Sequence, residues 1–144
     1  MAFVKIWIHF VWGTKSRKPL ISKKLKPILI SHIRRNVESK KIFIDSIDGG
    51  KDHIHILVSL GTNQSVSKVA HLLKGESSYW VNEQKLIRGK FEWQDEYFAV
   101  SVSESMLNKV QNYIKNQEEH HRSKTFIDEY DEFIKKYNFK QYSG

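Results

Sequence analysis

Two histidines and one tyrosine are the residues of this chain best suited to chemistry. His53 and His55 stand on either side of one isoleucine in HIHILVSL, and Tyr113 stands four residues before Gln117 in YIKNQ. Imidazole nitrogens and an amide oxygen can bind a divalent metal ion, and a phenol can act as a nucleophile. Together these groups could form a site that cuts phosphodiesters, provided that the fold brings them together.

The histidine pair lies on a predicted β-strand from His53 to Leu60. Alternate side chains of a strand face opposite sides, so the apolar positions from Ile54 onward face the core and both histidines face the other way. Both imidazoles can then reach one ion. The spacing alone leaves an alternative open, because two half-buried, hydrogen-bonded histidines on a sheet surface would give the same pattern.

The tyrosine lies on a predicted helix over about residues 104–122. At 100° per residue one broad face is apolar in its first half and polar in its second half. That face carries Met106, Leu107, Val110, Tyr113, Ile114, Gln117, His120 and His121. A buried amide needs hydrogen-bonding partners, so Gln117 indicates that this end of the helix faces a polar site. The alternative is a solvated amide at a fraying helix end.

The remaining pattern predicts a single domain over residues 1–144 with a ferredoxin-like core over about residues 1–102. In chain order we expect a strand at 3–12, a helix at 22–39, strands at 42–47 and 53–60, a helix at 65–83 and a strand at 97–102. This order predicts an α+β, RRM-like antiparallel sheet with two helices on one face and the other face open. The tyrosine helix is added after this core, and a shorter helix follows from Phe126 to Tyr137.

Basic residues are concentrated near the N-terminus. The chain has a net charge of +8, and residues 1–41 contain eleven Lys or Arg against one acidic residue. Such residues could neutralise phosphates and release counterions, although a solvated basic helix face would have the same composition. The candidate phosphate contacts are Lys15, Arg17, Lys18, Lys23 and Lys26, with Lys74 on the second predicted helix.

Composition also limits the environment of the chain. It contains no cysteine, which excludes disulfides and thiolate metal sites. The longest apolar runs are too short to cross a bilayer, and the first ten residues are more typical of a strand than of a signal peptide. We therefore expect a cytoplasmic protein with no membrane partner.

Several segments resemble one family in order and spacing. HFVWGTKSRKPLI, DHIHILVSL, SVSKVAHLLKG and FAVSVSESMLNKVQNYIKNQEEHH are similar to segments of the single-tyrosine HUH transposases, which move insertion sequences as single-stranded DNA and include REP-associated tyrosine transposases. HUH denotes two histidines around a bulky apolar residue, and Ile54 fits the middle place. The resemblance spans nearly the whole chain.

The resemblance implies that His53, His55 and Gln117 bind Mg²⁺ or Mn²⁺ and that Tyr113 is the nucleophile. Cleavage would link the protein to the DNA as a 5′-phosphotyrosine and free a 3′-hydroxyl, and rejoining would reverse this step with a new strand. The implied partners are single-stranded DNA hairpins at the element ends and a second copy of the chain. In such homodimers the tyrosine helix often completes the metal site of the partner, and one sequence does not distinguish this arrangement from a site within one chain.

Three further residues are candidates for supporting roles. Asp52 could orient an imidazole ring, or it could simply be a turn residue. His120 and His121 could help to remove the proton of the phenol, or they could be surface histidines near a helix C-terminus. The bound cation and water are the other candidates for this proton transfer.

Other functions compete with this interpretation. A histidine-triad hydrolase needs a third histidine where Leu57 stands. A non-catalytic module that binds single-stranded nucleic acid could also use a ferredoxin-like sheet, but the aromatic signature of such RNA-binding sheets is missing. A domesticated HUH nuclease, which binds DNA but is no longer mobile, is the third alternative.

Overall fold

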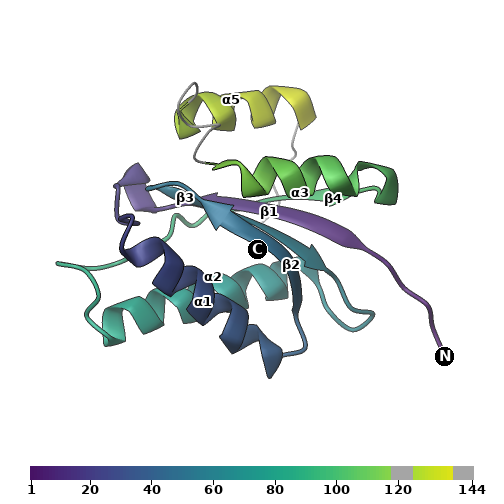
Figure 1. Ribbon diagram of the computed structural model, residues 1–144, viewed down its shortest axis with the longest axis horizontal. Helices are drawn as coiled ribbons and strands as arrows, with labels where there is room; N and C mark the ends of the chain where they lie inside the picture. The colour runs from purple at the N-terminus through teal and green to yellow at the C-terminus, as the bar shows by residue number, and fades with distance from the viewer. Residues whose placement is uncertain (118–124, 138–144) are drawn as a thin grey trace.

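The structure, a computed structural model, describes residues 1–117 and 125–137. Its centre is an antiparallel sheet in the order β2-β3-β1-β4. The strands are β1 (Trp7–Gly13), β2 (Phe43–Gly49), β3 (His53–Ser59) and β4 (Phe98–Val102). Helices α1 (Leu25–Glu38) and α2 (Val66–Glu83) lie on one side of the sheet, and α3 (Leu107–Lys115) and α5 (Phe126–Tyr137) lie on the other (Figure 1).

The predicted ferredoxin-like order is confirmed. Strand β1 runs through the middle of the sheet, where Phe10 pairs with Ile56 of β3 and with Ala99 of β4. The same register places Gly13 opposite His53 and Val11 opposite His55, so the end of β1 lies beside the histidine pair. Two 3-10 turns, at Lys15–Arg17 and Glu104–Met106, follow β1 and β4.

Two serines, at the first positions of the ranges predicted for the core helices, accept hydrogen bonds from the first turns of α1 and α2. The Leu25 amide donates to Ser22 Oγ at 3.0 Å, and the Lys68 amide donates to Ser65 Oγ at 3.2 Å. Such bonds satisfy amides that have no partner within the helix itself. The helices then pack their apolar faces, which include Leu29 of α1, against the buried side chains of the sheet.

Gly49 fixes the close approach at the end of the β2–β3 hairpin. A Cβ atom at this position would lie 2.2 Å from the carbonyl oxygen of His53 and 2.9 Å from Cα of Ile54. Only glycine permits this backbone contact. The hairpin therefore holds the start of the histidine strand tightly against its neighbour.

The second face of the sheet is not open, and that prediction is wrong. Helix α3 packs across β2 and β3, and its Ile114 forms a second apolar cluster with Trp7 and Leu57. Every residue of β1 is buried as a result. The amphipathic face of α3 supplies the cover that this side of the sheet needs.

The N-terminal strand is shorter than its alternating pattern predicts. Residues 1–6 are exposed and lie outside the sheet, with Phe3 92% exposed, and pairing begins at Trp7. At that residue β1 meets Ser59 and Val102, which are the last residues of β3 and β4. The alternating residues before Trp7 therefore have no adjacent strand with which to form a regular ladder.

The tyrosine helix also differs from its predicted extent. A 3-10 turn precedes it, α3 ends at Lys115, and Asn116 interrupts it with φ −101° and ψ 30°. The predicted continuation to residue 122 falls at 118–124, outside the described residues. The predicted last helix from Phe126 to Tyr137 is confirmed as α5. Among the described residues, we find no helix with the length and apolar character to cross a membrane.

Candidate metal and nucleophile site

His53 and His55 project from the same face of β3 and are almost completely buried, with 1% and 0% of their surfaces exposed. Each ring is held in its orientation by a hydrogen bond at its Nδ1 atom. His53 Nδ1 lies 2.9 Å from Asp52 Oδ1, and His55 Nδ1 lies 2.9 Å from Nε2 of His9 on β1. Carboxylate and imidazole partners of this kind fix the tautomer of a metal-binding histidine. Both Nε2 atoms can then face a common ion.

Asp52 thus stands where the sequence suggested, in contact with an imidazole ring. His9 was missed. Alternation along β1 puts it on the same side as Trp7 and Val11, but only the register of β1 with β3 brings it to His55. Burial, followed by the nearby charge of His55, lowers the pKa of His9 to about 3. His9 is therefore neutral at ordinary pH and can accept a hydrogen bond from His55 Nδ1.

We expect His9→Phe to weaken Mn²⁺ binding about 10- to 100-fold, the usual effect of losing a group that orients a metal ligand. Phenylalanine fills a similar space but cannot accept a hydrogen bond from His55 Nδ1. Calorimetric titration with Mn²⁺ measures the change, and thermal denaturation checks the fold. His9→Gln is the conservative control and should retain more of the affinity, because its amide oxygen can accept. Equal Mn²⁺ affinity in wild type and His9→Phe would show that His9 does not orient the ring.

Gln117 reaches the histidine pair from the end of α3. Its side chain is buried, its amide nitrogen donates to the Tyr113 carbonyl oxygen at 3.1 Å, and its Oε1 lies 3.1 Å from His53 Nε2. When neutral His53 donates from Nδ1 to Asp52, its Nε2 lone pair faces the lone pairs of the Gln117 oxygen. A cation between these two acceptors would satisfy both.

Tyr113 lies beside the same histidines. Its ring is half-buried and meets the His55 ring edge to face, with 5.4 Å between the ring centroids. The His9 ring lies on the same side, 6.3 Å from the tyrosine ring. One chain therefore brings both predicted parts of the site together.

Helix α5 adds a carboxylate that sequence reasoning missed. Glu129 is 2% exposed, its Oε1 lies 3.3 Å from His55 Nε2, and its Oε2 lies 4.0 Å from His53 Nε2. Burial raises the pKa of Glu129 to about 7, although the nearby His53 lowers it. The amphipathic pattern of α5 predicts a helix but does not indicate which of its acidic residues turns inward. No sequence signal identified Glu129.

These donors suit a divalent ion. The ligand atoms of His53, His55 and Glu129 lie within 4.8 Å of one another. Ligands about 2.1 Å from an octahedral Mg²⁺ lie about 3 Å apart when adjacent and about 4.2 Å apart when opposite. The separations of 3.1, 3.3 and 4.0 Å between individual donor pairs fall in this range, and the 4.8 Å limit for the whole set is slightly wider than the spacing of opposite ligands. Mixed imidazole and oxygen donors are compatible with Mn²⁺ as well as Mg²⁺.

The predicted phosphate contacts fall into two groups. Lys15, Lys18 and Lys23 are exposed, and Arg17 is half-buried. The turn from Lys15 follows Gly13, which pairs with His53, so it lies at the same end of the sheet as the histidines. Lys26 is partly buried and pairs with Asp48 at 3.1 Å.

Lys74, the candidate phosphate contact on α2, is largely buried. It is 9% exposed, and its ammonium donates to the carbonyl oxygens of Asp95 and Glu96 at 2.8 and 3.4 Å. Burial lowers the pKa of Lys74, although the carboxylates of these two residues raise it in part. Its contacts tie α2 to the segment before β4. The other two candidates, His120 and His121, lie outside the described residues.

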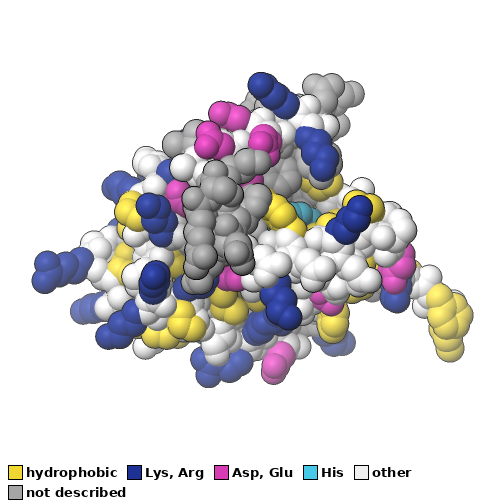
Figure 2. Space-filling model, turned by 45° about the horizontal axis from the view of Figure 1, so that its top comes forward, with side chains coloured by type: hydrophobic (Ala, Val, Ile, Leu, Met, Phe, Trp, Pro, Cys, Tyr) yellow, Lys and Arg dark blue, Asp and Glu magenta, His cyan; other side chains and the backbone are white. Residues whose placement is uncertain are grey.

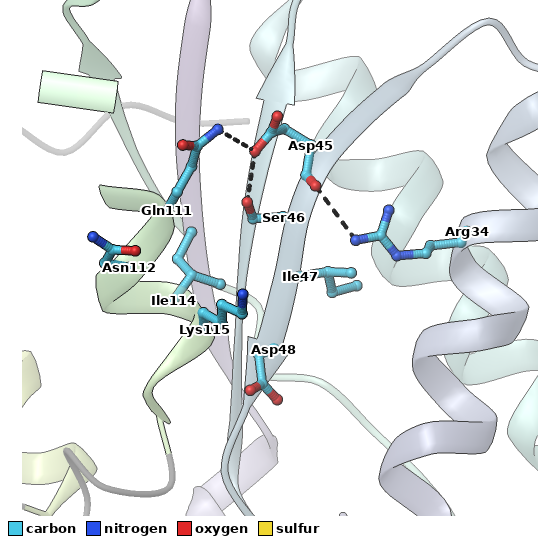
Figure 3. A pocket seen from close by; sticks show the side chains of 9 residues that line it. All are labelled: Arg34, Asp45, Ser46, Ile47, Asp48, Gln111, Asn112, Ile114 and Lys115. Carbon is cyan, nitrogen blue, oxygen red and sulfur yellow. Dashed lines mark hydrogen bonds between the residues drawn. The ribbon is translucent and has the colours of Figure 1, made fainter. Parts of the chain in front are cut away.

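A separate pocket opens between β2 and α3 (Figure 3). Gln111 of α3 donates to Asp45 Oδ2 at 2.9 Å across it, while Arg34 of α1 reaches the carbonyl oxygen of Asp45 at 3.4 Å. Its lining carries both acidic and basic residues and includes neither His53 nor His55. The donor cluster described above is therefore the better candidate for chemistry.

Two solved structures share this fold. A crystal structure assigned to a transposase of Deinococcus radiodurans R1 superimposes with a TM-score of 0.65 at 21% identity, covering 81% of this chain and 93% of that one. A REP-associated tyrosine transposase bound to a REP hairpin superimposes with a TM-score of 0.62 at 14% identity, covering 84% of this chain and 72% of that one.

Sequence comparison defines the family. Residues 2–117 match the family described as Transposase IS200 like, and the chain belongs to this family. The transposase for insertion sequence element IS200 from Salmonella typhimurium is 30% identical over 114 residues, covering 76% of this chain and 74% of that protein. ISDra2 transposase TnpA from Deinococcus radiodurans is 25% identical over 115 residues, covering 76% of this chain and 81% of that protein.

Proposed function

We propose that this transposase cleaves and rejoins single-stranded DNA through a covalent link to Tyr113, with a divalent metal ion held by His53, His55 and Gln117. One observation carries the proposal: Tyr113 of α3 lies 5.4 Å from the His55 ring, between ring centroids, and Oε1 of Gln117, two residues beyond α3, lies 3.1 Å from His53 Nε2. The proposed nucleophile thus lies beside the proposed metal donors, although they are distant in sequence.

Each residue has a definite task in this reaction. Tyr113 gives up its phenolic proton to solvent and its oxygen attacks phosphorus, the bond from phosphorus to the 3′-oxygen breaks, and the leaving oxygen takes up a proton from solvent to become a 3′-hydroxyl. The imidazoles and the amide of Gln117 would hold the metal, which would polarise the phosphate oxygen and offset the charge that develops there. Asp52 and His9 keep the two rings in position.

The covalent link preserves the energy of the broken bond. The 5′-phosphotyrosine is itself a phosphodiester and replaces the one that was cleaved. A later attack by another 3′-hydroxyl therefore restores DNA and releases the tyrosine. No nucleotide cofactor is needed for this exchange. The same site therefore serves both cleavage and joining.

We further propose that hairpins in single-stranded DNA at element ends are the substrate and that the chain acts as a homodimer. A structural neighbour of this fold is bound to a REP hairpin. The exposed basic residues Lys15, Lys18 and Lys23 follow β1 at the end of the sheet that carries His53, which is suitable for guiding a phosphate backbone toward the site.

We expect Lys18→Gln with Lys23→Gln to weaken binding of single-stranded DNA and to reduce its salt dependence. Each lost phosphate contact should lower the slope of log affinity against log salt by about 0.7. Fluorescence anisotropy at several salt concentrations measures both quantities. Lys68→Gln is the matched control, because this exposed lysine lies on the first turn of α2, which follows the other end of β3. An unchanged slope in the double variant would exclude these two residues as phosphate contacts.

The proposed function is tested by incubating the protein with Mn²⁺ and labelled single strands from the DNA that flanks its gene. We expect nicked DNA whose new 5′ end migrates with the protein under denaturing conditions. Binding without any covalent adduct, across both flanks, would instead support a non-catalytic module or a domesticated nuclease. Cleavage products without a protein link would contradict the tyrosine mechanism.

A further inference from the structure

We infer that Glu129 is an additional metal ligand, supplied by α5 of the same chain, and that the scissile phosphate must take its place at the ion. This inference rests on the proposed function, because it assumes that the histidine pair holds a metal. The inference adds a residue to the proposed ligands His53, His55 and Gln117. It also gives α5 a role in controlling access to the site.

The first support is the position of the carboxylate. Glu129 presents one oxygen to each histidine, at 3.3 Å from His55 Nε2 and 4.0 Å from His53 Nε2. These are the two ring atoms left facing the site once Asp52 and His9 have engaged Nδ1. A carboxylate next to two imidazole nitrogens lies where an oxygen ligand of a shared ion would lie.

Charge gives the second support. Two neutral imidazoles and one amide would leave the two positive charges of a buried ion uncompensated by these ligands. A carboxylate offsets one of these charges in a site that water reaches poorly, where electrostatic interactions are strong. Glu129 is therefore expected to contribute a large share of the metal affinity of the resting protein.

Burial shows that this arrangement is closed. His53, His55, Gln117 and Glu129 are each no more than 2% exposed, so a phosphodiester cannot reach an ion among them without a rearrangement. Helix α3 is anchored to the sheet by the apolar cluster around Ile114. Glu129 of α5 is paired with both histidines of the sheet. Moving α5 away would withdraw this carboxylate from the histidines, so α5 is the element whose displacement would open the site.

The charge of α5 agrees with this role. Asp128, Glu129, Asp131 and Glu132 lie within its first seven residues, and acidic side chains gather toward the end of the molecule where α5 lies (Figures 1 and 2). A phosphodiester approaching the histidines would meet these negative charges. Displacing α5 removes this repulsion and frees the coordination position at the same time.

The test measures two affinities that should change in opposite directions. All proteins carry Tyr113→Phe so that no cleavage occurs during titration. Adding Glu129→Gln should weaken Mn²⁺ binding without DNA, measured by electron paramagnetic resonance, by about tenfold or more. At saturating Mn²⁺ the same change should strengthen binding of flanking single-stranded DNA about five- to tenfold, because less of the binding energy is spent on opening the site.

Asp131→Asn is the matched control, since it removes the same charge from an exposed position on the same helix. It should leave Mn²⁺ affinity unchanged. Unchanged Mn²⁺ affinity in Glu129→Gln would overturn the assignment as a ligand, and parallel loss of Mn²⁺ and DNA affinity would overturn the displacement by phosphate. Adduct formation by the wild-type protein is scored separately, so failure of this inference is distinguishable from failure of the proposed function.

Discussion

Tyr113→Phe should abolish the covalent adduct between protein and DNA and reduce strand cleavage by at least about 10³-fold, the scale expected when a nucleophile is removed. The substitution deletes only the hydroxyl oxygen. The aromatic ring that packs beside His55 is retained, so the fold and the metal donors should be little affected. Denaturing gels of protein bound to labelled DNA measure adduct and cleavage together.

The informative control for this variant is Mn²⁺ and DNA binding, which should stay close to wild type. Tyr97→Phe provides a matched substitution, because Tyr97 packs against the Phe10 side of the sheet, away from the donor cluster. If Tyr113→Phe still nicked DNA at the wild-type rate, water or another residue would be the nucleophile, and the mechanism proposed here would be wrong.

His55→Ala should have the second-largest effect. It removes one of the two imidazoles, and we expect Mn²⁺ affinity to fall by about 100-fold or more, with a comparable loss of cleavage at limiting Mn²⁺. Loss of a fully buried side chain also leaves a cavity, so thermal denaturation must accompany the assay. His55→Gln is the control of closer volume. Wild-type Mn²⁺ affinity in both folded variants would place the metal site elsewhere.

Mixing the two inactive variants then tests which chain completes the site. In this structure Tyr113 and Gln117 meet the histidines of their own chain. We therefore expect no recovery of cleavage when His55→Ala and Tyr113→Phe subunits are combined. Recovery to about a quarter of wild-type activity or more would show that the tyrosine helix is exchanged between the two copies of a homodimer.

The sequence by itself determined the local parts of the site. Alternation of polar and apolar residues around His53 and His55 was enough to place both rings on one face, because the side chains of a strand alternate strictly. The four-residue spacing of Tyr113 and Gln117 similarly predicts that both lie on one side of the tyrosine helix. Periodicity depends only on neighbouring residues, so it can be read without knowing the fold.

Tertiary structure decided which distant residues join the histidine pair. His9 reaches His55 only because β1 pairs with β3 in one register, and Glu129 reaches both rings only because α5 folds back over the sheet. Lys74 shows the converse, since the sequence indicates a phosphate contact on a helix, whereas the ammonium donates to two backbone carbonyls. Periodicity indicates whether one side of an element is apolar, but the partner of a buried polar group depends on packing between segments far apart in the chain.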